Sequence, residues 1–254
     1  MTTYLVAGGT GVAGRAVATE LVRRGAAVRV LSRRGGTGDG IEHVVGDLLT
    51  GVGLAEALDG VDVVVDTTDG KTRRTRAVLT DGAANLLTAA AAAGVARAVL
   101  LSIVNVDTAR FAYYRAKTEQ ERLYREAALP THVVRATQFH EFVPMICAPA
   151  AKLGLVPAFT RTRFQSIDTS DVARALADAA GMVRPAAAPT VVAGPEILTM
   201  REMAVAWKDA TGARGRVTNI RMPGSMGAFW REGRNLVPDN RFGTVTFAQW
   251  LARR

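Results

Sequence analysis

The sequence predicts an α/β protein built on a doubly wound parallel sheet, and three observations support this fold class. Apolar runs typical of strands alternate with segments of helical spacing between Thr3 and Ala136. These runs are continuously apolar, as expected when helices cover both faces of a sheet. A glycine-rich turn directly follows the first run. Right-handed crossovers then place a ligand crevice beyond the carboxyl ends of the strands.

The expected strands follow one another with helical segments between most of them. They cover residues Thr3–Ala7, Ala27–Leu31, His43–Val45, Val61–Asp66, Ala98–Asn105 and His132–Ala136. We expect a sheet region over residues 1–138 and a small C-terminal lobe over residues 139–254. Part of the lobe should return to the sheet, so that the chain forms one compact unit.

The C-terminal region carries breakers and later helix signals. Prolines and a glycine predict an irregular lobe or lid, and they are Pro144, Pro149, Gly154 and Pro157. Residues 164–168 resemble a short return strand that leads into a helix over residues 171–180. Thr199 and Glu202 have capping-box spacing and predict a helix that ends near Gly212.

Composition excludes several classes of protein. The single cysteine, Cys147, cannot support a disulfide framework or a zinc site, and the three histidines lack metal-ligand spacing. The longest apolar region, residues 83–106, is interrupted by polar residues and is not a membrane span. The start of the chain lacks a basic region followed by an apolar signal core. We therefore expect a cytoplasmic protein without a metal.

The net charge of +9 raises the question of nucleic-acid binding. Most of this charge is arginine scattered along the chain, and the densest run is residues 71–76. No aromatic residues interleave with it and no DNA-reading module is present, so we do not expect nucleic acid as a partner. The run is better interpreted as a solvated loop near an anionic ligand.

The glycine-rich turn, GGTGVAG, lies between the first strand and a segment with helical spacing that stops at Gly25. Glycine lets the backbone approach a pyrophosphate, and the free N–H groups of the new helix face its negative charge. This arrangement predicts a Rossmann-type dinucleotide site. The expected contacts in the turn are Gly8, Thr10, Gly11, Val12 and Gly14.

The residues after the second strand predict which cofactor binds. Proteins that bind NAD usually have an acidic residue here for the ribose 2′-hydroxyl, but this chain has Ser32, Arg33 and Arg34 and no carboxylate before Asp39. Two guanidinium groups would pair with a 2′-phosphate. The expected cofactor is NADP(H); the alternative is that these arginines only face solvent.

Other strand ends supply further candidates. After the third strand, Asp47 and Leu48 could contact the adenine, although Asp47 is equally a helix cap. Thr67 and Thr68 follow the fourth strand and should lie near the middle of the cofactor.

Residues 111–129 predict a helix with a lysine on its mostly apolar face. Tyr113 and Lys117 lie one turn apart on that face, whereas Glu121 lies among the charged residues of the opposite face. An inward ammonium group requires partners, and a tyrosine hydroxyl and a cofactor ribose would supply them. The cation would lower the pKa of the tyrosine toward working pH. The alternative is a lysine that extends to solvent beside a core tyrosine.

At this point the sequence resembles the short-chain dehydrogenase/reductase superfamily, most closely its atypical NmrA-like branch. The similar segments are GGTGVAG, SIVNVD, YYRAK, RATQFHEF and AGPEILTMREM. The resemblance implies that Tyr113 donates a proton to a carbonyl, Lys117 holds the ribose, and Ser102 binds the substrate oxygen. Relatives often have a second hydroxyl residue beside the serine, where this chain has Ile103, so Asn105 or a water could take over the role of Ser102.

The segment after the sixth strand should lie at the edge of the ligand crevice. By the resemblance, Thr137 and Phe139 contact the cofactor, and Gln138 and His140 contact the substrate. His140 is either a second acid/base group or a structural histidine.

Together these observations predict an NADP(H)-dependent oxidoreductase that reduces a carbonyl or an enone of a small molecule. Two alternatives remain open: an NADP(H)-sensing regulator without catalysis, and a non-redox enzyme on the same scaffold. The resemblance implies that regulators of this branch typically lack the active-site tyrosine, so the presence of Tyr113 favours an enzyme. No motif sets the oligomeric state.

Overall fold

The structure is a computed structural model that describes residues 1–36, 40–70, 72, 75–183 and 188–253. Asp39 and three members of the charged run, Lys71, Arg73 and Arg74, lie outside the described residues. The chain forms two compact units. The first contains Met1–Ser102, Ala112–Arg135 and Val172–Thr190, and the second contains Ile103–Phe111, Ala136–Asp171 and Val191–Arg254.

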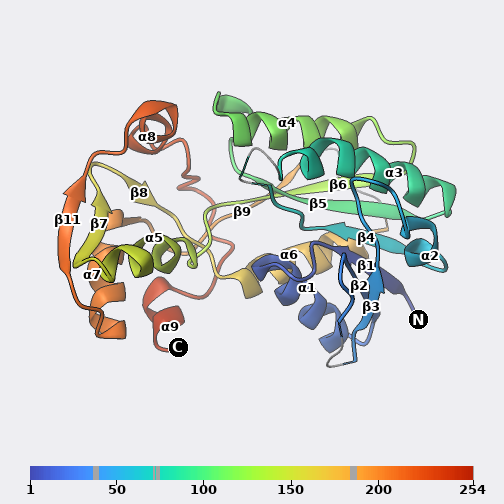
Figure 1. Cartoon of the computed structure of the whole chain (residues 1–254), viewed down its shortest axis with the longest axis horizontal. Helices are drawn as coiled ribbons and strands as arrows, with labels where there is room; N and C mark the ends of the chain where they lie inside the picture. Colours follow the sequence, from blue (N-terminus) through green and yellow to red (C-terminus); the bar gives the residue numbers. More distant parts are fainter. Residues whose placement is uncertain (37–39, 71, 73–74, 184–187, 254) are drawn as a thin grey trace. The chain divides into compact units, whose positions relative to one another are not determined.

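The central element is a seven-stranded sheet in the order β3-β2-β1-β4-β5-β6-β9 (Figure 1). Its strands are β1 (Thr3–Ala7), β2 (Ala27–Ser32), β3 (Glu42–Val45), β4 (Val63–Asp66), β5 (Arg97–Ile103), β6 (Thr131–Ala136) and β9 (Thr190–Val192). The pairs β1–β2, β2–β3, β1–β4 and β4–β5 are all parallel. All six strands expected from the sequence are present.

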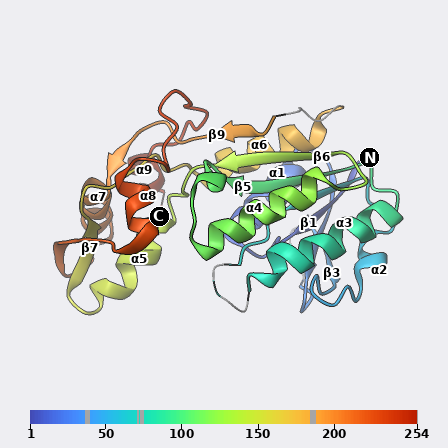
Figure 2. The ribbon, with the colours of Figure 1, turned by 90° about the horizontal axis from the view of Figure 1, so that it is seen from above.

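Helices cover both faces of this sheet. They are α1 (Val12–Arg23), α2 (Leu54–Leu58), α3 (Ala83–Ala92), α4 (Ala112–Arg125) and α6 (Thr169–Gly181), and a π-helical turn, η1 (Val78–Gly82), leads into α3. Figures 1 and 2 show α3 and α4 on one face and α1 and α6 on the other. The doubly wound Rossmann-type fold is therefore confirmed.

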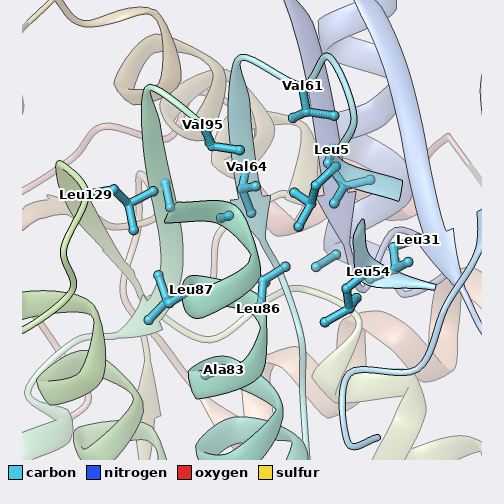
Figure 3. Packing of buried hydrophobic residues seen from close by; sticks show 14 of the residues in the cluster. Leu5, Leu31, Leu54, Val61, Val64, Ala83, Leu86, Leu87, Val95 and Leu129 are labelled. Atoms are coloured by element: carbon cyan, nitrogen blue, oxygen red, sulfur yellow. The ribbon is translucent and has the colours of Figure 1, made fainter. Parts of the chain in front are cut away.

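One hydrophobic cluster of the first unit lies between the sheet and α3. Leu5 of β1, Val64 of β4 and Leu86 of α3 are fully buried and belong to one cluster (Figure 3). Burial of each such aliphatic side chain contributes about 1.5–3 kcal/mol relative to exposure. This packing holds the carboxyl ends of β1 and β4 side by side.

The second unit contains two small sheets and several helices. In one sheet β7 (Leu155–Phe159) pairs parallel with β11 (Arg216–Ile220), and in the other β8 (Arg163–Phe164) pairs antiparallel with β10 (Leu198–Thr199). The helical elements are α5 (Phe142–Ala151), α7 (Met200–Thr211), α8 (Gly224–Arg231), α9 (Phe247–Leu251) and the 3₁₀ turn η2 (Val106–Thr108). Both α5 and α7 pack against β7.

The expectation of an irregular lobe after Pro144 is wrong, because this segment forms a helix and a strand, α5 and β7. Pro144 lies in the first turn of α5, where a backbone N–H is not needed, and Pro149 lies near the end of the same helix. Pro157 is accommodated in β7, a strand of a two-stranded sheet. The return strand expected over residues 164–168 is shorter, since only Arg163–Phe164 forms β8.

The later helix signals are confirmed. Thr199 accepts a hydrogen bond from the Glu202 backbone N–H, and the Glu202 side chain accepts from the Thr199 backbone, so the capping box is complete. Gly212 ends α7 in the left-handed conformation, with φ 62°.

No helix in the described part of the chain combines the length and apolar character needed to cross a membrane. Within the same residues, no group of three or more histidine, cysteine or acidic side chains is arranged to hold a metal ion.

Candidate active site

The glycine-rich turn joins β1 to α1 and packs too closely for larger residues. A Cβ atom on Gly14 would lie 2.3 Å from the Gly8 carbonyl oxygen, and one on Gly8 would lie 2.9 Å from the Thr67 backbone. Gly8 also has a φ of 75°, which favours glycine. The N-cap residue, Gly11, offers no side-chain cap to the N–H groups that open α1, and Gly11 and Val12 are exposed. The Gly11 N–H itself donates to the Gly8 carbonyl at 2.9 Å, so the N–H groups that follow it are the ones suited to an anion such as a pyrophosphate.

The candidate residues after β4 lie directly beside this turn. Thr67 donates its hydroxyl and its backbone N–H to the Ala7 carbonyl oxygen, at 2.8 and 2.9 Å. Both Thr67 and Thr68 are buried. Pairing of β1 with β4 therefore brings two separate candidate segments of the sequence to one edge.

The candidate residues after β2 are exposed, whereas those after β3 form hydrogen bonds within the chain. Arg33 and Arg34 are exposed, and neither has a hydrogen-bond or ion-pair partner within the described part of the chain. Asp47 closes a turn, because its carboxylate accepts from the Leu49 N–H at 2.8 Å. The Leu48 carbonyl accepts from the Asn85 side chain at 2.8 Å.

Lys117 of α4 is buried, only 4% exposed, and does not extend to solvent. Its Nζ donates to the Gln120 side-chain oxygen at 2.8 Å, to the Leu101 carbonyl at 2.9 Å and to the Thr68 carbonyl at 3.4 Å. These contacts place the ammonium group at the carboxyl ends of β4 and β5. Burial lowers the pKa of Lys117, and the charge of Asp66 opposes this effect.

Tyr113 has a partner that the sequence analysis did not identify. Its hydroxyl donates to the carboxylate of the exposed Asp69 at 2.8 Å. Burial and this negative charge raise the pKa of Tyr113, which is opposite to the lowering expected from Lys117. The reason is that Asp69 comes from the segment after β4, and residue spacing on α4 gives no information about it.

Ser102, near the carboxyl end of β5, is 3% exposed. Its Oγ is buried and has no hydrogen-bond partner among the described residues. Buried hydroxyl groups are normally paired, so this unpaired oxygen makes Ser102 a candidate for contact with a bound molecule. Asn105, the proposed substitute, donates its amide to the Arg234 carbonyl at 2.8 Å within the second unit.

Glu121 does not lie on the solvent face of α4, as the helical spacing predicted. It is 3% exposed and pairs with Arg135 of β6, with contacts at 2.9 and 2.5 Å. A salt bridge to the sheet compensates the burial of this charge. The helix periodicity could not reveal a partner on a strand.

Four candidate residues belong to the second unit. Thr137 and His140 are buried, whereas Gln138 and Phe139 are only partly buried. His140 Nδ1 lies 2.8 Å from the Ser166 hydroxyl and its Nε2 lies 3.1 Å from the Val245 carbonyl. Because a carbonyl can only accept, Nε2 carries the proton and Nδ1 accepts from Ser166. Both ring nitrogens are therefore used within the protein, and this geometry favours the structural alternative.

Replacement of His140 by alanine should lower stability by about 3 kcal/mol or more, because a cavity forms and two buried polar groups lose their partner. Chemical denaturation measures this effect. NADPH affinity should remain nearly unchanged. A stable variant with altered NADPH affinity would contradict the structural role.

The same residue should make stability depend on pH. Burial lowers the pKa of His140, so its contribution is complete above the unfolded-state value of about 6.5 and is lost as pH falls below it. The melting temperature should therefore fall between pH 6.5 and 5, less steeply in His140→Gln than in the wild type. Equal slopes would show that His140 is not responsible.

Comparisons with known proteins concern the family and the fold of the chain. The model of the NAD(P)H-binding family matches residues 8–182, and the chain belongs to that family. The family match supports a nicotinamide dinucleotide as the cofactor. The expected superfamily, the short-chain dehydrogenases/reductases, is named for one of the solved structures that share the fold. No curated protein matches the sequence.

Several solved structures share the fold. An NADPH-dependent quinone oxidoreductase from Escherichia coli, complexed with NADPH, is 17% identical with a TM-score of 0.75 and covers 98% of this chain and 99% of its own. A short-chain dehydrogenase/reductase superfamily protein from Agrobacterium tumefaciens with bound NAD is 21% identical, with a TM-score of 0.75 and coverage of 99% and 95%. A nucleoside-diphosphate-sugar epimerase from Staphylococcus aureus is 16% identical, with a TM-score of 0.76 and coverage of 99% of both chains.

Proposed function

We propose that this protein is an NADP(H)-dependent oxidoreductase that reduces a carbonyl or an enone of a small molecule. The observation that carries the proposal is the orphan hydroxyl of Ser102. Ser102 directly follows Leu101, whose carbonyl accepts a hydrogen bond from Lys117. Lys117 in turn lies one helical turn from Tyr113. A substrate oxygen is a suitable partner for Ser102 in this setting.

The residues present fit the cofactor. The glycine turn would hold the pyrophosphate, and Arg33 and Arg34 the 2′-phosphate. Lys117 would hold the ribose by exchanging its longest contact, 3.4 Å to the Thr68 carbonyl, for one to a ribose hydroxyl. Further contacts are assigned to Ser32, Asp47, Leu48, Thr67, Thr68, Thr137 and Phe139. When bound, the cofactor supplies the hydride.

Tyr113 holds the proton for the substrate. Because its pKa is raised, the hydroxyl stays protonated at neutral pH. Carbonyl reduction produces an alkoxide, which is basic enough to take that proton. Tyr113 must then exchange its hydrogen bond to Asp69 for one to the substrate.

The second unit is proposed to form the small substrate lobe. Gln138 is the substrate contact, because it is partly buried and directly follows Thr137. His140 then acts by anchoring the segment that carries Gln138.

The test is a turnover screen with NADPH deuterated at C4 against aldehydes, ketones, quinones and enones. Deuterium in a product supports the proposal. NADPH-dependent binding to a partner protein without any turnover would favour a regulator. An isomerised product without cofactor consumption would indicate a non-redox enzyme.

Preference for NADPH over NADH should depend on Arg33 and Arg34. A charge-assisted hydrogen bond contributes about 1.5–3 kcal/mol, so NADPH should bind about ten- to a hundred-fold more tightly. The double variant Arg33→Ala/Arg34→Ala should lose most of this difference in dissociation constants. The exposed pair Arg125→Ala/Arg241→Ala changes the net charge equally and should keep it. Equal wild-type affinities for both cofactors would contradict the assignment.

A further inference from the structure

A carboxylate lies fully buried at the end of β4, where an apolar residue would be expected. Asp66 accepts from the Thr68 N–H at 2.8 Å, from the Tyr124 hydroxyl at 2.9 Å and from the Gln120 amide at 3.0 Å. A buried carboxylate costs stability unless a positive charge and hydrogen bonds compensate it. The hydrogen bonds are present, and the nearby cation is Lys117.

Gln120 connects the two charged groups. Its amide nitrogen donates to Asp66 and to the Thr68 hydroxyl, at 3.0 and 3.2 Å, and its oxygen accepts from Lys117 at 2.8 Å. Gln120 is fully buried, so water cannot replace these contacts. The amide is polarised from both ends, which strengthens both bonds.

The partners of Lys117 indicate its charge state. All three are oxygen acceptors, and a protonated amine has three N–H donors whereas a neutral amine has two. The arrangement therefore fits the ammonium form.

We propose that Asp66 is the buried counter-charge of Lys117 and that Gln120 transmits its effect, which makes Asp66 a positioning residue of the cofactor site. The inference rests on the proposed function only in that Lys117 contacts the cofactor ribose. Without Asp66, the ammonium group would lose the charge that compensates its removal from water.

The acidic groups near Lys117 differ in their burial and in their partners. The acidic groups that face it are Asp66 from β4, Asp69 from the segment after β4 and Glu121 from α4 itself. Glu121 is paired with Arg135, and Asp69 is exposed beside Tyr113. All three carboxylates raise the pKa of Lys117, and Asp66 has the largest effect of the three.

The first experiment titrates Lys117 in the protein without added cofactor. The chain has four lysines, Lys71, Lys117, Lys152 and Lys208, so ¹³Cε-labelled lysine gives a resolvable NMR spectrum, and Lys117→Met identifies the signal. Asp66→Asn keeps the shape but removes the charge, and it should weaken proton binding by Lys117 at least ten-fold. The matched control Tyr124→Phe removes one hydrogen bond to Asp66 and should cause a smaller change. An unchanged titration in Asp66→Asn would overturn the proposal.

A second experiment remains decisive if Asp66→Asn folds poorly. Each single variant, Asp66→Asn or Lys117→Met, leaves one buried charge without its partner. The double variant removes both charges. Its unfolding equilibrium constant should be at least ten-fold smaller than the value expected if the destabilisation by each single variant were simply added. Additive losses would refute the pairing.

Cofactor affinity separates this inference from the proposed function. The Asp66→Asn variant should bind NADPH at pH 7. Its affinity for NADPH should fall as the pH rises, and this fall should begin at a lower pH than in the wild type. A shifted Lys117 titration with unchanged NADPH affinity would leave Asp66 as the counter-charge but would remove it from the cofactor site. Failure of the wild type to reduce any substrate would affect only the proposed function.

Discussion

Replacement of Tyr113 by phenylalanine is expected to lower turnover by about a hundred- to ten-thousand-fold. The change removes the proton donor but keeps the ring, which packs edge-on against Tyr114 with centroids 5.8 Å apart. The fold and NADPH affinity should therefore be nearly unchanged. Steady-state kinetics on a substrate that the wild type reduces measure the loss, and fluorescence titration measures the affinity.

The matched control is Tyr114→Phe, which removes a hydroxyl from the next residue of the same helix. Tyr114 is buried, and burial alone accounts for the raised pKa of its hydroxyl. Its variant should keep wild-type turnover. Wild-type-like turnover by Tyr113→Phe would remove the assigned mechanism, even with fold and cofactor correct.

Replacement of Gly14 by alanine should lower NADPH affinity by at least ten-fold and also lower stability. The new Cβ would lie 2.3 Å from the Gly8 carbonyl oxygen and 2.6 Å from the Gly9 Cα, so the turn must move away from α1. Overpacking of this kind costs about 1–3 kcal/mol. The displaced N–H groups would no longer converge on the pyrophosphate. Isothermal titration with NADPH and thermal denaturation measure the two effects.

Gly181→Ala is the control for this substitution. A Cβ there meets nothing within 4 Å, and the residue ends α6, so stability should be unchanged or slightly higher. NADPH affinity should match the wild type. If Gly14→Ala also binds NADPH like the wild type, the turn does not cradle the cofactor.

The fold was largely predictable because its signals are local. A buried parallel strand such as Val63–Asp66 requires a continuous apolar run, and the glycine turn requires a strand before it and a helix after it. Thr199 and Glu202 predicted their helix start because both partners of a capping box lie within four residues. In contrast, the prolines around α5 suggested irregularity, since local rules do not reveal that Pro144 falls in the first turn of a helix, where no N–H donor is needed, or that the helix accommodates Pro149 near its end.

The sequence indicated where the candidate side chains lie, but it did not indicate which hydrogen-bond partners they have. The positions of Ser102, Tyr113 and Lys117 follow from motif and helical spacing, because the carboxyl ends of parallel strands share one edge. Asp66 had a signal, a carboxylate at the end of the apolar run VVVD, but nothing in the sequence linked it to Gln120. Asp69 likewise gave no sign that it would reach Tyr113.

Local signals therefore specify the doubly wound sheet, the glycine turn and the order of the candidate side chains along its carboxyl edge, because periodicity and backbone requirements are set over a few neighbouring residues. The partners of the buried polar groups depend on how the chain packs: Lys117 with Gln120 and Asp66, Tyr113 with Asp69, and His140 with Ser166. Except for Gln120, which lies on the same helix as Lys117, these partners come from elements far apart in the chain. A polar group removed from water must be satisfied by whichever donor or acceptor the packing brings within reach.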